Sequence, residues 1–170
     1  MSAGMNIREA RKGDVIEMDG EKWEAWYFAT AIASGRPVIK LHPGTGTGLT
    51  DPDQGTLAEI ADDGSAPDLY PFGIVDALYN TNPSSPTPAG TTVAAAYAWV
   101  KVKGWIKMTT LLAITPTAGH AFKLHNRAID TTGAVPSVSA SNEPGQFQAG
   151  GASVTHTVYL YGRDRVTSTT

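Results

Sequence analysis

The clearest pattern along the chain is an alternation of residue types between positions 97 and 108. The even positions, from Ala98 to Met108, hold small or apolar residues, whereas the odd ones hold Tyr, Trp and Lys. Successive side chains of an extended strand point to opposite faces, so this period of two predicts a β-strand with one face in a core. The face with aromatic and lysine side chains suits a half-buried edge or an interface. Gly104 predicts a bulge or bend within the strand.

Other segments also read as strands. Residues 152–161 alternate, with Val154, Val158 and Leu160 on one side and Thr and Tyr on the other. Asp19-Gly20 is a favoured two-residue turn, which predicts a hairpin with its flanks. Shorter strands are expected at 38–41, 72–79 and 121–124. The helical pattern is weak, and 6–12 and 56–62 are each expected to form one or two turns at most.

These elements predict an all-β protein, a β-barrel or β-sandwich with long loops and an extended amino-terminal segment. Residues 42–55, 80–92 and 131–151 form long connections rich in Gly, Pro, Ser and Ala. Such connections are uncommon inside a compact domain unless they have a function or touch a partner. We therefore expect surfaces that are shaped by neighbouring molecules.

One short segment occurs twice. Residues 33–42 and 117–125 each contain a glycine turn, a short apolar strand and a closing Lys-Leu-His. A duplication predicts two related small lobes; the alternative is that a glycine turn before a strand is simply common. We expect an amino-terminal arm and hairpin at 1–30, a first β lobe with an acidic loop insertion at 31–110, and a second β lobe at 111–170.

Composition narrows the possible functions of the 170 residues. The net charge of −3 argues against an electrostatic nucleic-acid binder. The chain has no cysteine, which excludes disulfides, thiolate zinc sites and cysteine nucleophiles. No apolar run approaches the roughly 20 residues of a membrane span. The polar amino terminus lacks the apolar stretch of a signal peptide.

Charge is segregated along the chain. Residues 41–100 contain seven acids and no Lys or Arg, whereas residues 101–127 contain four Lys, one Arg and no acid. One interpretation is that these segments pair within a single subunit. The other is that acidic and basic patches meet between subunits, where they would set register and encounter rate.

The sequence contains no motif that specifies catalysis or metal binding. His120 and His125 lie five residues apart and so point to opposite faces of a strand. His156 falls on the apolar side of its strand and is expected to be a satisfied core histidine. Asp51-Pro52-Asp53-Gln54-Gly55 resembles part of a calcium loop, but Gly55 stands where an oxygen ligand is expected. We assign no catalytic residue, no metal and no cofactor.

Two further features carry a family resemblance. The first is Ala118–Leu124, followed by the small residues 133–135 and a closing strand at 154–160. The second is the small-residue strand Phe72–Leu78. Together they resemble the capsid decoration, or cement, proteins of tailed bacteriophages. The resemblance covers residues 32–41 and 72–162.

This resemblance implies a β-barrel or β-sandwich module that binds the outer face of an icosahedral shell. It implies the major capsid protein as partner, self-association as a homotrimer, and no nucleic-acid or membrane partner. The protein would be located on the capsid exterior after assembly in the bacterial cytoplasm. Many members of the family are shorter single lobes, so the amino-terminal portion and the acidic segment are additional here.

We expect capsid contacts at two places that combine apolar residues with charge. The residues are Met5, Ile7, Arg8 and Arg11 in the amino-terminal segment, and Trp99, Lys101, Lys103 and Trp105 on the aromatic-lysine strand face.

The alternative function is a carbohydrate-binding β-sandwich module of a phage tail or fibre, or of a cell surface. It requires at least two of Trp23, Trp26, Trp99 and Trp105 to be exposed on one flat face. Core packing is the first interpretation of the aromatic segment 23–28, and a sugar-stacking platform is the second. A hydrolase would need a histidine beside a carboxylate in a cleft.

Overall fold

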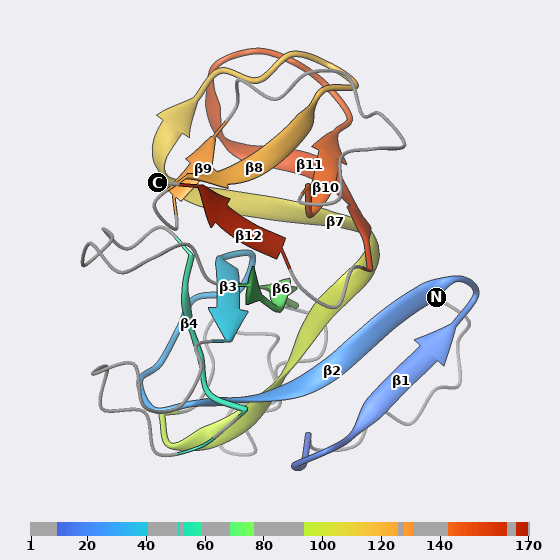
Figure 1. Cartoon of the computed structure of the whole chain (residues 1–170), viewed down its shortest axis with the longest axis vertical. Coiled ribbons are helices and arrows are strands. Elements are labelled where there is room, and N and C mark those ends of the chain that lie inside the picture. The colour runs from blue at the N-terminus through green and yellow to red at the C-terminus, as the bar shows by residue number, and fades with distance from the viewer. Residues whose placement is uncertain are drawn as a thin grey trace.

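The computed structural model describes residues 10–40, 51, 53–58, 69–76, 94–125, 128–130, 143–162 and 166–169. Within these residues the chain forms twelve strands and no helix, which confirms the all-β prediction (Figure 1). In chain order the strands are β1 (Val15–Met18), β2 (Glu21–Phe28), β3 (Pro37–Lys40), β4 (Gly55–Leu57), β5 (Leu69–Tyr70), β6 (Phe72–Val75), β7 (Ala96–Ile114), β8 (Ala121–His125), β9 (Ala128–Asp130), β10 (Gly145–Phe147), β11 (Ser153–Tyr161) and β12 (Val166–Thr169).

The strands belong to one hydrogen-bonded network. Nine of them follow the order β4-β3-β6-β7-β11-β10-β8-β12-β5, while β1 pairs with β2, β2 with β7, and β9 with β8. The pairing is antiparallel except between β12 and β8. The terminal strands of the path, β4 and β5, do not pair with each other in the described part of the chain. The sheet is therefore open and not closed into a barrel.

Strand β7 is the centre of the molecule. Its first half pairs with β2 and β6, and its second half pairs with β11. The predicted strand at 97–108 is thus confirmed and extends to Ile114. Gly104 lies where the partners change, with φ of +105°. The register with β2 shifts close by, since Lys22 pairs with Lys103 and Trp23 with Lys101, which skips Val102. The bend expected at this glycine is confirmed.

The hairpin at Asp19-Gly20 is also confirmed. Both turn residues have positive φ, +52° and +80°, as the favoured two-residue hairpin turn requires. The shorter predicted strands match β3, β6 and β8, although residues 41 and 77–79 lie outside the described part.

The two weak helix predictions are wrong where they can be compared. Residues 10–12 are not helical, and Thr56 and Leu57 belong to β4, where they pair with β3. Local helix propensity over so few residues is too weak to compete with a cross-strand ladder. Residues 6–9 and 59–62 lie outside the described residues. The expected connection at 131–151 contains β10.

Buried apolar side chains form three clusters. The first joins Ile39 and Ile74 to Met108, Phe122 and Val158, so it draws on strands from early and late in the chain. The second surrounds Trp26 and Phe28. The third contains Ala10, Trp23, Ala25 and Trp99, with Ile16 packed against it. The core-packing interpretation is therefore confirmed for Trp23, Trp26 and Phe28.

The duplicated segment adopts the same turn twice. In the turns at 33–36 and 117–120, the fourth N–H donates to the first carbonyl, at 3.3 and 3.1 Å. The third residue is Gly35 or Gly119, with φ of +81° and +75°. Glycine is needed at both places because a left-handed φ disfavours other residues.

The likeness continues into the neighbouring strands. β3 pairs with β6 and β6 with β7, just as β8 pairs with β10 and β10 with β11. Val75 N–H donates to Arg36 O, and Phe147 N–H donates to His120 O. We call β2, β3, β6 and residues 96–103 of β7 the first repeat. Residues 104–114 of β7 with β8, β10 and β11 form the second repeat.

The two repeats share β7, which ends one and begins the other. In this correspondence Lys101 matches Tyr159, since Lys101 pairs with Ile74 and Tyr159 with Gln146. Trp23, opposite Lys101, then matches Trp105, opposite Tyr159. The lobe boundaries expected at residues 30/31 and 110/111 stay predictions.

Candidate functional site

One face of the β7–β11 pair is open to solvent. We define this outer face by four cross-strand pairs: Lys103 with Tyr161, Trp105 with Tyr159, Lys107 with Thr157, and Thr109 with Thr155. Each of these residues is at least partly exposed, whereas Met108, Val158 and Leu160 between them are buried. The outer face is thus the polar and aromatic side of a half-buried antiparallel ladder.

Aromatic rings form a row across the outer face. The Trp105 and Tyr159 rings lie 5.1 Å apart in an edge-to-face arrangement, and the Tyr159 and Tyr161 rings lie 6.2 Å apart. The Tyr161 hydroxyl donates to Gln146 Oε1 at 3.1 Å. Trp105 keeps 45% of its surface exposed. The tilted rings fix one another but do not form a flat platform.

Lysines flank this aromatic row. Within the described residues, no carboxylate lies within ion-pair distance of Lys103 or Lys107. The outer face therefore combines exposed aromatic surface with lysines that have no ion-pair partner among the described residues. Such a surface favours a partner that carries negative charge.

The far end of the same strand pair is apolar. Leu111, Leu112 and Val154 are 66%, 75% and 43% exposed, and we call them the apolar end. The Thr110 hydroxyl lies 2.8 Å from Leu112 O and 3.2 Å from Val154 O, which holds the two strands together here.

Val154 corrects one expectation from the sequence. It was placed with Val158 and Leu160 on the apolar side of its strand, but it is exposed while they are buried. The register between β11 and β7 shifts between Ser153 and Thr155. A bulge of this kind re-aims a side chain, which explains why simple alternation fails at this end.

The structure separates the residues expected to contact a capsid. Lys103 and Trp105 lie on the outer face. Arg11 is exposed in the turn before β1, where its N–H donates to the Asp14 carboxylate at 3.1 Å, and it is not on the outer face. Met5, Ile7 and Arg8 lie outside the described residues.

The expectation of an exposed surface at Trp99 and Lys101 is wrong. Trp99 is fully buried and Lys101 is 5% exposed. This half of β7 is not an edge, because β2 and β6 flank it. Ala10 and Ile16 also cover the Trp99 side of the sheet.

Lys101 is held by three groups. Its Nζ lies 2.8 Å from Glu21 Oε1, 2.8 Å from Trp105 O and 4.6 Å from the centre of the Trp23 ring. The Trp23 indole N–H in turn donates to the buried Asp76 carboxylate at 2.8 Å. Sequence analysis did not single out Glu21 or Asp76 for these contacts. A lysine within an apolar strand is the only signal, since a buried ammonium needs a partner.

A pocket of about 400 Å³ lies where the two repeats meet. Its lining includes Asp76 and Lys101 from the first repeat, and Trp105 and Lys107 from the second. Ser34 also lines it, and its buried Oγ has no hydrogen-bond partner in the part of the chain that the structure describes.

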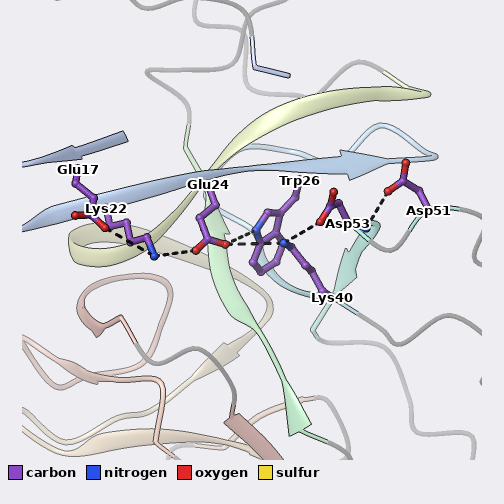
Figure 2. A network of polar contacts seen from close by, with 7 residues as sticks. All are labelled: Glu17, Lys22, Glu24, Trp26, Lys40, Asp51 and Asp53. Carbon is purple, nitrogen blue, oxygen red and sulfur yellow. Dashed lines mark hydrogen bonds and ion pairs between the residues drawn. The ribbon is translucent and has the colours of Figure 1, made fainter. Parts of the chain in front are cut away.

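A second polar network crosses β2, β3 and the segment before β4 (Figure 2). Lys22 Nζ lies 3.9 Å from Glu17 and 3.2 Å from Glu24, and Lys40 Nζ lies 3.9 Å from Glu24 and 3.5 Å from Asp53. In the described residues, the acidic segment thus pairs with β3 through Asp53, and the basic segment pairs with Glu21.

The segment that resembles part of a calcium loop contains an aspartate turn. Asp51 Oδ1 accepts from Asp53 N–H at 2.8 Å, and Asp51 Oδ2 accepts from the Tyr97 hydroxyl at 3.1 Å. Burial, then this hydrogen bond and the negative charges of Asp51 and Asp53, raises the pKa of Tyr97 to about 12. Of the residues described, no three acidic or histidine side chains cluster to hold a metal ion.

The histidine predictions are partly resolved. His156 is buried, its Nε2 lies 2.8 Å from Ser153 O, and its ring packs on Phe147, which confirms the core assignment. His120 lies at the turn before β8. His42 and the side chain of His125 lie outside the described part.

No family model matches the chain, and no curated protein or solved structure matches it either. The described part of the chain contains no helix that is long and apolar enough to cross a membrane.

Proposed function

We propose that this chain is a virion structural protein that binds the outer surface of an icosahedral phage capsid and stabilises contacts between capsomers. The observation that carries the proposal is the exposure of Leu111, Leu112 and Val154 beside the aromatic and cationic outer face. An exposed apolar patch with a polar rim is typical of a protein-binding surface. The family resemblance supplies the identity of the partner.

This function needs shape and not reactive groups. A homotrimer would present three apolar ends to the major capsid protein at once, and linked sites raise the effective concentration of each contact. The lysines of the outer face would set the orientation of binding more than its strength. In this proposal the protein acts without a cofactor, without enzymatic activity and without a nucleic-acid or membrane partner, on the capsid exterior.

The carbohydrate-binding alternative has no observation in its favour. It required at least two tryptophans exposed on one flat face, but Trp23, Trp26 and Trp99 are buried and only Trp105 is exposed. The Tyr159 ring meets the Trp105 ring edge-to-face, so the two rings offer no flat surface on which a sugar could stack.

The test uses purified phage particles. We expect this chain in integral ratio to the major capsid protein, and knock-out particles should lose resistance to heat. Added back to these particles, the double variant L111D/L112D should bind at least about tenfold more weakly than wild type, because charge would have to enter an apolar contact. V15D, which changes an exposed residue of β1, is the matched control. Knock-out particles of unchanged stability, or equal binding by L111D/L112D, would contradict the proposal.

A further inference from the structure

The two repeats differ in what covers them. In the first repeat, β1 pairs with the edge of β2, and Ala10 and Ile16 pack against Trp23, Ala25 and Trp99. Figure 1 shows β1 running along the outer side of β2, away from the rest of the sheet. As a result Trp23 is only 2% exposed.

In the described part of the chain, no strand covers the corresponding surface of the second repeat. Trp105 takes the place of Trp23, and Lys107 takes the place of Ala25. Trp105 is 45% exposed, and Lys107 is exposed as well. Two equivalent positions in one fold thus differ because one has a covering strand and the other has none among the described residues.

The backbone groups of β2 in the first repeat and of β7 in the second also differ in whether a neighbouring strand binds them. In the first repeat, Ala25 N–H donates to Asp14 O at 3.0 Å, at the start of β1. In the second, Thr109 N–H donates to Gly35 O at 2.7 Å, which shows that the backbone groups of odd residues here point away from β11. Lys107 lies two residues earlier, so its N–H and C=O point the same way. No described group is recorded as a hydrogen-bond partner of either, although Gly35 packs close to Lys107 O and so marks the end of the open edge.

The edge faces the pocket of about 400 Å³. Val75 and Ile106 give it apolar walls, and the unpartnered Ser34 Oγ lies in its lining. Lys101 Nζ already donates to Trp105 O at 2.8 Å. That carbonyl is therefore not available to an added strand. Lys107 is therefore the residue through which a strand would pair.

We propose that the free edge of β7 at Trp105–Lys107 binds an extended segment of another protein chain, one that carries an acidic and an apolar residue two positions apart and so on one face. That segment would add a strand as β1 does on β2, with an apolar side chain over Trp105 and an acidic one beside Lys103 or Lys107. Asp14 and Ile16 are the fold's own example of this pattern, because Ile16 pairs with Trp23 and Asp14 bonds Ala25, the counterparts of Trp105 and Lys107. The inference does not depend on the capsid function, because it rests on the comparison of the repeats.

The test titrates the intact chain with a capped synthetic peptide of residues 13–18, Gly-Asp-Val-Ile-Glu-Met, followed by amide and indole NMR shifts. We expect shifts at Lys107 N–H and the Trp105 indole, with a Kd of about 0.1–1 mM for so short a strand. K107E should weaken binding at least about fivefold, by charge repulsion. K12E, at an exposed lysine before β1, should not change it.

Three outcomes would overturn the inference. They are no shift at millimolar peptide, shifts confined to β1 and β2, and equal binding by wild type and K107E. A fourth concerns the occupant: if wild type sediments as a dimer that K107E dissociates, a second copy fills the edge and not a foreign segment. Particle binding is measured separately, so failure of the capsid proposal leaves this result unaffected.

Discussion

Lys101 is a buried charge at the middle of the sheet. Its side chain is 7% exposed, whereas that of its partner Glu21 is 36% exposed. Removing the carboxylate would leave the ammonium buried beside Trp23 and Trp105 O without a counter-charge. A buried charge without a partner costs more free energy than the ion pair contributes to folding. The ranking of the variants by stability is therefore more informative than the size of any single change.

We therefore expect E21A to destabilise the protein by about 1–3 kcal/mol, and E21A/K101M to be more stable than E21A. Urea denaturation of both single variants and the double variant measures this as a double-mutant cycle. The effect of removing a surface charge alone is controlled by K12M, which removes an exposed lysine and should change stability by less than about 0.5 kcal/mol. A double variant less stable than E21A would mean that Lys101 is not held by Glu21.

Tyr97 makes the stability depend on alkaline pH. The folded state raises its pKa from 10.0 to about 12. The unfolded chain therefore loses this proton first, and stability that is present below about pH 10 falls as pH rises towards 12. We expect Y97F to lose less stability than wild type between pH 9.5 and pH 11.5, two values set by that pKa window. Equal pH slopes for the two proteins would show that burial and the Asp51 contact do not raise the pKa of Tyr97 in the folded protein.

At the scale of the strands, two glycines mark the same position in the two repeats. A Cβ at Gly73 would collide with Val100 and lie 2.9 Å from Lys101 O, and a Cβ at Gly145 would collide with Tyr159 O. In both, the short strand pairs closely with the long strand beside it, β7 or β11. Neither glycine has a positive φ, so the requirement comes from packing and not from backbone strain.

We expect G73A and G145A each to destabilise the protein by about 2–4 kcal/mol, since overpacking against backbone cannot relax by a rotamer change. G20N is the control, because a Cβ at Gly20 meets nothing within 4 Å and Asn tolerates its φ of +80°. Thermal unfolding of the three variants measures the difference. If G73A were as stable as G20N, the two strands would not be packed as tightly as described.

The sequence predicted the strands that carry their own signal. β7 and β11 show long alternation, and Asp19-Gly20 specifies its turn locally. The strands β4 and β10 have only three residues each and exist because distant strands pair with them, so no local pattern reveals them.

The candidate surface was predicted only in part, for a related reason. Alternation identifies two faces of a strand but does not show what covers each of them. Trp105 and Trp99 look equivalent in the sequence, yet Trp99 is buried beneath Ala10 and Ile16, which lie more than eighty residues earlier. The apolar end was missed because it depends on the bulge at Val154.

At the scale of the whole molecule, the two repeats are joined in two ways. β7 supplies a strand to both, and the first apolar cluster contains Ile39 and Ile74 of the first repeat with Phe147 and Val158 of the second. Because neither repeat completes this cluster alone, the free energy of unfolding should be common to both.

This coupling predicts how a local substitution spreads. Phe147 is fully buried and packs on Phe122 in the second repeat. F147A should cost about 3–5 kcal/mol through the cavity it leaves. If the repeats unfold together, the amides of β2 and β11 should lose hydrogen-exchange protection by the same factor, although β2 does not contact Phe147 in the sheet order. L112A, at an exposed apolar residue, should leave protection unchanged in both strands. Loss of protection in β11 with β2 unaffected would instead mean that each repeat unfolds as its own unit, with β7 as a hinge between them.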